Sequence, residues 1–472
     1  MSFQSLHFVI FLISIFTLNR LFLNRINARK NLLLIASYYF YTCWDWRFAG
    51  LMLFMTAINF IAGKKIEESN LKREKYFWLS FALLLCLGVL GYFKYANFFI
   101  ESASQLLKSF GLETNLPLLQ LLLPIGISFF TFQSLSYSID IFRGCEKSTT
   151  SFRDFSLFVA FFPTVLSGPI TRARWLLPQF ENPLPDSRKR SEEGFALIIR
   201  GFVKKMAFAD VLAIQLVNPA FSSPSDYSAL FLLVAVYAYS FQIYMDLSGY
   251  TDIAIGTAKL FGFELPENFN RPYQAVSVSN FWQRWHISMS SFFRDYLYFG
   301  VGGSKYGNVY VNLYITFIAI GIWHGAGWNF VLYGLIHGSV IAIERWFRNR
   351  RKAQGLPIKQ TRSLTWFISI FLTFQIVAFS RILFRSPDIS SAGNYLSAMF
   401  WSITDYTPFT TVGPTILIIA IVLHYVPTSV FLNTSVVYFR MPIIIQGGII
   451  VGVVFFLMAF SSGSAPFVYF QF

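Results

Sequence analysis

The chain has 472 residues, of which 55% are apolar and only 13% are charged. A soluble domain carries about 25% charged residues, so this composition excludes a soluble surface over most of the chain. The formal net charge is +15. Because the basic residues punctuate apolar runs and do not gather on one polar face, they indicate cytoplasmic loops of a membrane protein and no nucleic-acid partner.

Apolar runs recur along the whole chain, and a membrane-spanning helix needs about 20 such residues. The candidate spans are residues 3–23, 31–45, 47–63, 76–96, 117–140, 155–170, 193–218, 228–247, 308–323, 327–346, 364–384, 413–431 and 443–461. Runs 31–45 and 155–170 are shorter than a full span, so we expect them to be tilted, paired as a hairpin or partly inserted. The first run follows no basic residue and precedes no cleavage site, which predicts an uncleaved first span.

The positions of the basic residues predict the topology. Lys and Arg gather in 25–30, in a loop at 64–75 and in a loop at 345–362, whereas the acidic stretch 386–412 contains none. The positive-inside rule therefore places the first three segments in the cytoplasm and the stretch 386–412 outside. The same count puts both termini on the extracytoplasmic side.

His324 is the first candidate site residue, because an ionisable group inside a bilayer is costly and is a functional candidate by default. It lies in GIWHGAGWNF, at the junction of two apolar runs, among three glycines and beside Trp323. A neutral imidazole there can act as a general base. A histidine hydrogen-bonded between helices is the alternative.

His286 is the second candidate and lies in SNFWQRWHISMSSFFRDYLY. The pattern predicts one helix, capped by Asn280 or Ser279, that is too polar to span and lies at the interface or re-enters the membrane. Its Arg284 falls on the opposite side. The apolar face holds Trp282, His286, Met289 and Phe293.

Asp246 and Asp252, in YMDLSGYTDIAIG, are a second intramembrane signal. Each is expected either to pack helices by pairing with a basic neighbour or to line a substrate path. We interpret His337 and His424 as structural. The histidines have no metal-ligand spacing, and Cys43, Cys86 and Cys145 are isolated, so no metal site and no disulfide framework is expected.

Several segments together resemble the membrane-bound O-acyltransferase superfamily (MBOAT), in the bacterial branch that includes the alginate O-acetyltransferase membrane subunit. They are NFNRPYQAVSVSNFWQRWHISMSSFFRDYLY, GIWHGAGWNFVLYGLIHG, LPIGISFFTFQSLSYSIDIFRG, FFPTVLSGPITR and the terminal PFVYFQF. The resemblance implies that His324 is the catalytic histidine and that His286 is the second histidine of the bacterial branch.

The resemblance also implies an all-α polytopic fold. About 11–13 transmembrane or re-entrant helices would ring a funnel and a tunnel that meet at the histidine. The chain would form one membrane domain over 1–472, with N-terminal helices in 1–116, the catalytic core with re-entrant helices in 117–346 and C-terminal helices in 347–472.

The implied activity is transfer of an acetyl group from a cytoplasmic thioester to hydroxyls of an extracytoplasmic polysaccharide, of the alginate type or peptidoglycan. The co-substrate would be acetyl-CoA or another acyl thioester, delivered by CoA or an acyl carrier protein, with no bound cofactor. No Cys or Ser stands beside either histidine as a nucleophile, so direct transfer is expected. The residues expected to line the donor site or tunnel are Trp282, Arg284, Asn280, Trp323 and Asp246.

The expected setting is the bacterial cytoplasmic (inner) membrane, with a periplasmic or extracellular O-acetyltransferase partner that completes delivery to the polymer. Three alternatives stay open. One is a D-alanyl transferase of the same family that uses a carrier-protein thioester. A transporter is another, although no internal repeat is visible, and a non-catalytic export scaffold is the third.

Overall fold

The computed structural model describes residues 1, 3, 5–112, 116–355, 364–401, 404 and 406–460. Within these ranges the chain forms helices and no strand, which confirms the all-α class. They make two compact units, one of Met1–Phe195 with Ala254–Pro266 and the other of Ala196–Ile253 with Glu267–Phe472. The terminal PFVYFQF motif and the predicted side of the C-terminus lie outside the described residues.

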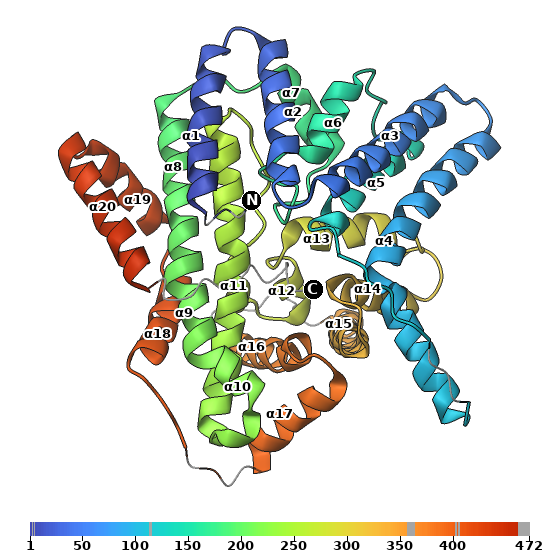
Figure 1. Ribbon diagram of the computed structural model, residues 1–472. Coiled ribbons are helices and arrows are strands. Elements are labelled where there is room, and N and C mark those ends of the chain that lie inside the picture. Colours follow the sequence, from blue (N-terminus) through green and yellow to red (C-terminus); the bar gives the residue numbers. More distant parts are fainter. Residues whose placement is uncertain are drawn as a thin grey trace. The chain divides into compact units, whose positions relative to one another are not determined.

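The first unit contains the N-terminal helices. They are α1 (Leu6–Leu21), α2 (Ile26–Thr42), α3 (Trp46–Glu68), α4 (Lys72–Ser109), α5 (Ile127–Phe142), α6 (Phe152–Ala160), α7 (Ala173–Glu181) and the first part of α8 (Arg188–Val203). Helix α3 packs against both α4 and α5 (Figure 1). Polar side chains fix this packing, since Ser138 of α5 donates a hydrogen bond to the Asn59 Oδ1 of α3 at 2.7 Å.

The second unit contains most of the remaining helices. It begins with three short π-helical and α-helical pieces after α8, namely η1 (Lys204–Ala209), α9 (Asp210–Leu212) and η2 (Ala213–Val217). Next come α10 (Asn218–Ser222), η3 (Pro224–Asp226), α11 (Ala229–Leu260), η4 (Pro272–Gln274), α12 (Val278–Trp282), α13 (Ile287–Phe292) and η5 (Phe293–Tyr298). The last are α14 (Val309–His324), α15 (Trp328–Ala353), α16 (Leu364–Arg385), α17 (Ile389–Trp401), α18 (Val412–Tyr425), α19 (Thr428–Arg440) and α20 (Ile443–Phe460).

Every apolar run found in the sequence overlaps at least one of these helices, although residues 117–126 of the run 117–140 precede α5 and are not helical. In the described part of the chain, five helices are long and apolar enough to cross a membrane, namely α3, α4, α11, α15 and α16. The bent pair of α18 and α19 would make a sixth, and α1, α14 and α20 are shorter apolar helices. The run 155–170 yields only the short α6, since its helix ends at Ala160.

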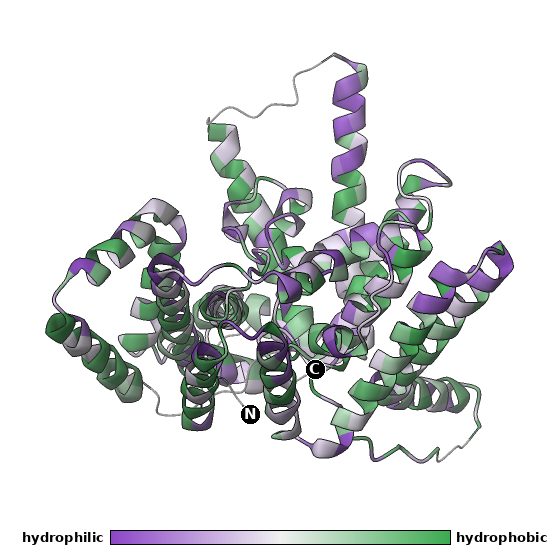
Figure 2. Cartoon of the chain, turned by 90° about the horizontal axis from the view of Figure 1, so that it is seen from above, coloured by the Kyte–Doolittle hydropathy of each residue, from purple (hydrophilic) through white to green (hydrophobic). Residues whose placement is uncertain are grey.

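The basic segments predicted as loops are largely helical. Helix α3 continues to Glu68 and α4 begins at Lys72, which leaves three residues of the predicted loop 64–75 outside a helix. Helix α15 continues to Ala353, nine residues into the predicted loop 345–362. Figure 2 shows this end of α15 as hydrophilic, next to the grey trace. The end of an apolar run therefore marks where a helix changes environment, while the helix itself continues.

Helices α14 and α15 form a tight hairpin (Figure 1). A Cβ on Gly321 would collide with the carbonyl oxygen of Phe330, and one on Gly334 with the carbonyl oxygen of Phe317. The two glycines thus let two antiparallel backbones approach closely, as small residues do in membrane helix pairs. This contact fixes His324, at the end of α14, beside the start of α15.

A cluster of buried charges links the segment after α8 to α11. Lys205, which is 1% exposed, pairs with Asp210 at 2.9 Å and with Asp246 at 2.7 Å. Lys204 and Arg200 both pair with Asp252, at 2.7 and 2.6 Å. The three cations and three carboxylates neutralise one another, which meets the requirement that charges buried from water be paired.

The close approach of α14 and α15 predicts that Gly334→Ala destabilises the protein. The new methyl group must push the Phe317 carbonyl aside, and such overpacking costs about 1–3 kcal/mol. Thermal unfolding in detergent measures the loss. Gly91→Ala in α4, where nothing lies within 4 Å of the added Cβ, is the control. A melting temperature for Gly334→Ala equal to that of Gly91→Ala would contradict the tight hairpin.

The ion cluster predicts that Lys205→Met costs about 3–5 kcal/mol of folding free energy, because it leaves two buried carboxylates without their cation. Denaturant or thermal unfolding measures the effect. The matched control is Lys189→Met, which removes the same charge from an exposed residue. Adding Asp246→Asn to Lys205→Met removes one of the stranded charges, and it should recover part of the lost stability.

Candidate active site

The prediction of one continuous helix around His286 is wrong, because the helix is broken there. Helix α12 ends at Trp282, α13 begins at Ile287, and His286 between them has φ 44° and ψ 55°. Among the described residues only His286 and Arg271 have a positive φ without being glycine. The N-cap of α12 is Ser277, which accepts a bond from the Asn280 amide, and neither Asn280 nor Ser279 caps the helix.

The residue that holds this break is Asn268. Its carbonyl oxygen accepts a bond from the Ile287 amide at 2.9 Å. Its Oδ1 accepts from the amide and the hydroxyl of Ser288, at 3.0 and 2.9 Å. These bonds satisfy N–H groups that an unbroken helix would bond internally. His286 is therefore fixed in the left-handed region, a conformation that is found mainly where function or tight packing requires it.

Trp323 brings the two predicted catalytic histidines together. The ring of Trp323 lies edge-on to that of His286, with 5.8 Å between centroids, and 4.9 Å from that of His324. His286 is 1% exposed and His324 is 3% exposed. The two imidazoles thus share one indole as a neighbour and lie in the same buried aromatic pocket of the second unit.

His324 is the last residue of α14, and two further helices complete its surroundings. The ring of Phe384 from α16 packs edge-on at 5.0 Å, and that of Tyr333 from α15 at 6.1 Å. The hairpin of α14 and α15 positions the contact with Tyr333, and the packing of α16 against α15 positions the contact with Phe384. An imidazole held by aromatic rings on several sides has a fixed orientation, which a general base requires.

His337 is buried behind this pocket and is hydrogen-bonded at both ring nitrogens. The Trp282 indole donates to its Nδ1 at 3.2 Å, and its Nε2 lies 3.0 Å from the Ser380 hydroxyl. Since an indole N–H can only donate, Nδ1 carries no proton and Nε2–H donates to Ser380. The ring of Tyr333 lies 4.4 Å from His337 and thereby links it to the pocket of His324.

Arg381 of α16 supports the segment next to His286. This arginine is 2% exposed, and its guanidinium lies 4.4 Å from the ring centroid of Trp285. It donates hydrogen bonds to the carbonyl oxygen of Ser240, at 3.0 Å, and to the Tyr273 hydroxyl. The cation thus ties α11 and α16 to the broken helix through a cation–π contact.

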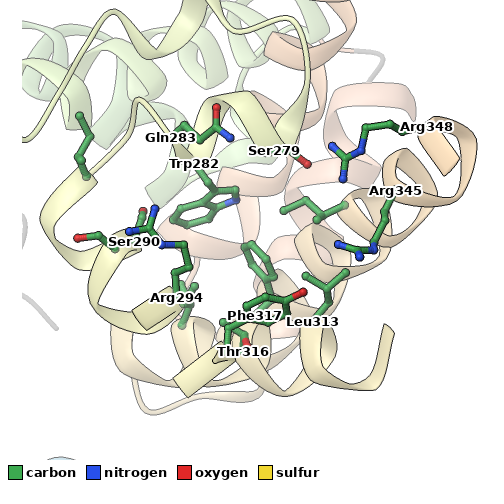
Figure 3. A pocket seen from close by; sticks show the side chains of 15 residues that line it. Ser279, Trp282, Gln283, Ser290, Arg294, Leu313, Thr316, Phe317, Arg345 and Arg348 are labelled. Carbon is green, nitrogen blue, oxygen red and sulfur yellow. The ribbon is translucent and has the colours of Figure 1, made fainter. Parts of the chain in front are cut away.

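A cavity of about 340 Å³ opens beside Trp282. Figure 3 shows Trp282 and Phe317 in its middle, with Arg294 on one side and Arg345 and Arg348 on the other. Its further lining is Ser279, Gln283, Ile287, Ser290, Ser291, Tyr298, Leu313, Thr316, Ile320 and Ile341. An apolar wall with three guanidinium groups suits a ligand that has both an apolar and an anionic part.

Four of the five residues predicted to line the donor site or tunnel do not border this cavity. The Arg284 Nε donates to the Asn280 Oδ1 at 3.1 Å, so these two side chains bind each other. Asp246 pairs with Lys205, as its packing alternative required. Trp323 lies between the histidines, and of the predicted lining residues Trp282 alone borders the cavity of Figure 3.

Sequence reasoning missed Asn268, Tyr333 and Phe384. Asn268 lies 18 residues before His286, and nothing in its local pattern marks it as a hydrogen-bond partner. Tyr333 did carry a signal, since it precedes His337 by four residues and so shares its helix face. Phe384 contacts His324 because α16 packs beside it, and the packing of distant helices cannot be seen in a single sequence.

Comparison of the sequence with known proteins identifies its family. The model of the membrane-bound O-acyltransferase family, MBOAT, matches residues 33–384. The "Probable alginate O-acetylase AlgI" of Azotobacter vinelandii is 39% identical over 391 residues, which cover 81% of this chain and 76% of that protein.

More distant relatives carry related names. The "Peptidoglycan O-acetyltransferase" of Helicobacter pylori is 32% identical, over 78% of this chain and 73% of that protein. The "Teichoic acid D-alanyltransferase" of Streptococcus thermophilus is 29% identical, over 55% of this chain and 68% of that protein. The region matched by the family model, residues 33–384, contains His286, His324, Trp323 and the residues that line the cavity. The chain therefore belongs to the membrane-bound O-acyltransferase family and is a multi-pass membrane O-acyltransferase.

Proposed function

We propose that this enzyme transfers an acetyl group from a cytoplasmic thioester to hydroxyls of an extracytoplasmic polysaccharide, of the alginate type or peptidoglycan. The observation that carries the proposal is His324, buried at the end of α14 in a chain that resembles alginate and peptidoglycan O-acetyltransferases. The acetyl-CoA co-substrate, or another acyl thioester, binds from the cytoplasm, and the polysaccharide hydroxyl approaches from the other side.

The cavity beside Trp282 is the proposed donor site. Two of its arginines, Arg345 and Arg348, belong to the basic end of α15, which the positive-inside rule assigns to the cytoplasm. The Nε of Arg345 is buried and has no hydrogen-bond partner in the described part of the chain. A donor phosphate or pantetheine amide would satisfy it, while the apolar wall of Trp282 and Phe317 holds the aliphatic arm.

His324 acts as the general base in this mechanism. Its neutral imidazole accepts the hydroxyl proton as the hydroxyl oxygen attacks the thioester carbonyl. The new C–O bond forms, the C–S bond breaks, and the leaving thiolate takes the proton back from the imidazolium. His286, which Asn268 holds in contact with Trp323, orients the reacting groups in the same aromatic pocket.

The setting of this reaction is a bacterial inner membrane with both termini outside. A periplasmic or extracellular O-acetyltransferase is the proposed partner, because the acetyl group leaves the membrane domain on that side and must still reach a polymer. Co-purification with such a protein tests the partnership.

The runner-up is D-alanyl transfer from a carrier-protein thioester, which a 29% identical relative performs by name. The donor discriminates the two activities. Purified enzyme supplied with acetyl-CoA and a polysaccharide acceptor should release free CoA. Consumption of a carrier-bound D-alanyl thioester, with acetyl-CoA untouched, would favour the runner-up.

His324→Ala should lower polysaccharide acetylation by about 10²–10⁴-fold, the usual contribution of general acid–base catalysis. Mass spectrometry of the polymer measures the product, and size-exclusion chromatography in detergent verifies folding. His7→Ala, which removes an exposed histidine bonded to Tyr39, is the control. Wild-type product levels in a folded His324→Ala enzyme would refute the assigned base.

His286 offers a test that separates chemistry from conformation. His286→Gly should be more stable than His286→Ala by about 1 kcal/mol, because glycine adopts the left-handed conformation without strain. Both variants lack the imidazole, so both should lose most of their acetylation activity. If His286→Gly stays active while His286→Ala does not, then the bend at this position matters and the imidazole does not.

A further inference from the structure

A second cavity, of about 320 Å³, lies in the first unit. None of its lining residues belongs to the second unit, which holds His286 and His324. It is bordered by the end of α1, the loop before α8, and the end of α11. The lining residues are Asn19, Arg20, Leu23, Asn24, Arg29, Pro183, Leu184, Pro185, Asp186, Arg190, Ser191, Lys259, Leu260, Phe261 and Gly262. The proposed acyl transfer does not use this cavity.

Positive charge exceeds negative charge in this cavity. Of its four cations, Arg20 pairs with Asp186, and Lys259 pairs with Glu193 at 2.7 Å. Arg29 and Arg190 have no carboxylate within 4.0 Å in the described part of the chain. Asp186 also opposes the charge of Arg29, from beyond 4.0 Å, but it is already paired with Arg20. The cavity therefore keeps a net positive charge.

Of these two arginines, Arg29 is the stronger indication of a ligand, because its side chain is only 8% exposed. The adjacent Lys30 is buried to the same degree and is neutralised by Asp154 at 2.7 Å. A buried cation without an anion is strongly destabilising. Lys30 has a carboxylate of its own, whereas Arg29 shares the more distant Asp186 with Arg20 and faces a polar cavity. An anion from a ligand would therefore stabilise Arg29.

The geometry of Arg29 is fixed in advance. Its Nε donates to the Asn19 Oδ1 at 3.1 Å, and its Nη2 donates to the Phe261 carbonyl oxygen at 3.0 Å. These bonds use two of the five guanidinium N–H groups. A planar guanidinium with donors to spare is the group that proteins prefer for binding phosphate.

The wall of the cavity beside Arg29 is also preformed. Gly262 has φ +81°, a conformation that favours glycine, and a Cβ there would lie 2.9 Å from the Leu184 carbonyl oxygen. The Leu184 amide donates to the Gly262 carbonyl oxygen at 3.0 Å. The loop before α8 and the end of α11 thus close around the cavity without help from a ligand.

The neighbourhood of the cavity is apolar. Leu18 and Leu21 of α1 are 40% and 72% exposed, and Leu23, which lines the cavity, is 37% exposed. The positive-inside rule assigns this end of α1 to the cytoplasmic face of the membrane. Basic pockets between helices on that face bind anionic lipid headgroups.

From this combination we propose that the cavity binds a phosphate group through Arg29 and Arg190, and that the phosphate is the headgroup of an anionic phospholipid of the cytoplasmic leaflet. The acyl chains of that lipid lie along the exposed leucines of α1. A soluble phosphate compound offers the same chemistry without the chains, and the experiment distinguishes the two sources.

The test uses the purified full-length protein in detergent. Its thermal unfolding is followed with increasing phosphatidylglycerol, with phosphatidylcholine, and with inorganic phosphate. Phosphatidylglycerol should raise the melting temperature saturably, whereas phosphatidylcholine and inorganic phosphate should not. Arg29→Gln and Arg190→Gln should each weaken the phosphatidylglycerol effect about fivefold, the usual contribution of one basic residue near a lipid surface. Arg190→Gln keeps the test valid if Arg29→Gln does not fold.

The control is Arg188→Gln, which removes an exposed arginine that pairs with Glu192 at 2.7 Å and does not line the cavity. A response to inorganic phosphate that depends on Arg29 and Arg190 would keep the phosphate site but overturn the lipid as its ligand. A phosphatidylglycerol effect that all three variants weaken equally would reflect general surface charge and overturn the site. No response in any arm overturns it as well.

Discussion

The structure depends on one constraint: inside a bilayer no water is available, so a buried polar group needs a partner in the protein or in a bound ligand. The chain meets this demand with long-range pairs. Lys205 is placed between Asp210 and Asp246, and Asn59 binds Ser138 on a neighbouring helix. Such pairs determine which helices pack side by side, because apolar surfaces that face lipid do not by themselves favour one neighbouring helix over another.

The active-site region applies the same constraint to a broken helix. The break at His286 exposes amide groups, and Asn268 accepts hydrogen bonds from two of them, those of Ile287 and Ser288. On the other side, close packing of Gly321 and Gly334 sets the end of α14, and with it His324. Two features of different kinds, a hydrogen-bonded break and a steric contact, therefore bring two histidines into contact with Trp323.

Much of this could be predicted from the sequence, and the rest fails for physical reasons. Apolar runs locate the helices, since burial in lipid requires them, and isolated intramembrane histidines point to the candidate site. The left-handed conformation of His286 was not predictable, because the residue that holds it lies 18 positions away. The partner of Asp246 was equally hidden, since an ion pair between distant segments leaves no periodic trace. Helix ends were misplaced where basic residues continue a helix beyond the apolar run, as in α15.

The hydrogen bonds of His337 limit how protons can travel. They run in one direction, from the Trp282 indole to His337, from His337 to the Ser380 hydroxyl, and from that hydroxyl to the Val377 carbonyl oxygen at 2.8 Å. This wire begins at an indole, which does not release its proton at physiological pH, and ends at a carbonyl that cannot pass one on. If His324 takes up the hydroxyl proton as proposed, these bonds give that proton no exit. In the proposed mechanism the departing thiolate is then the group that accepts it and restores the neutral imidazole after each turnover.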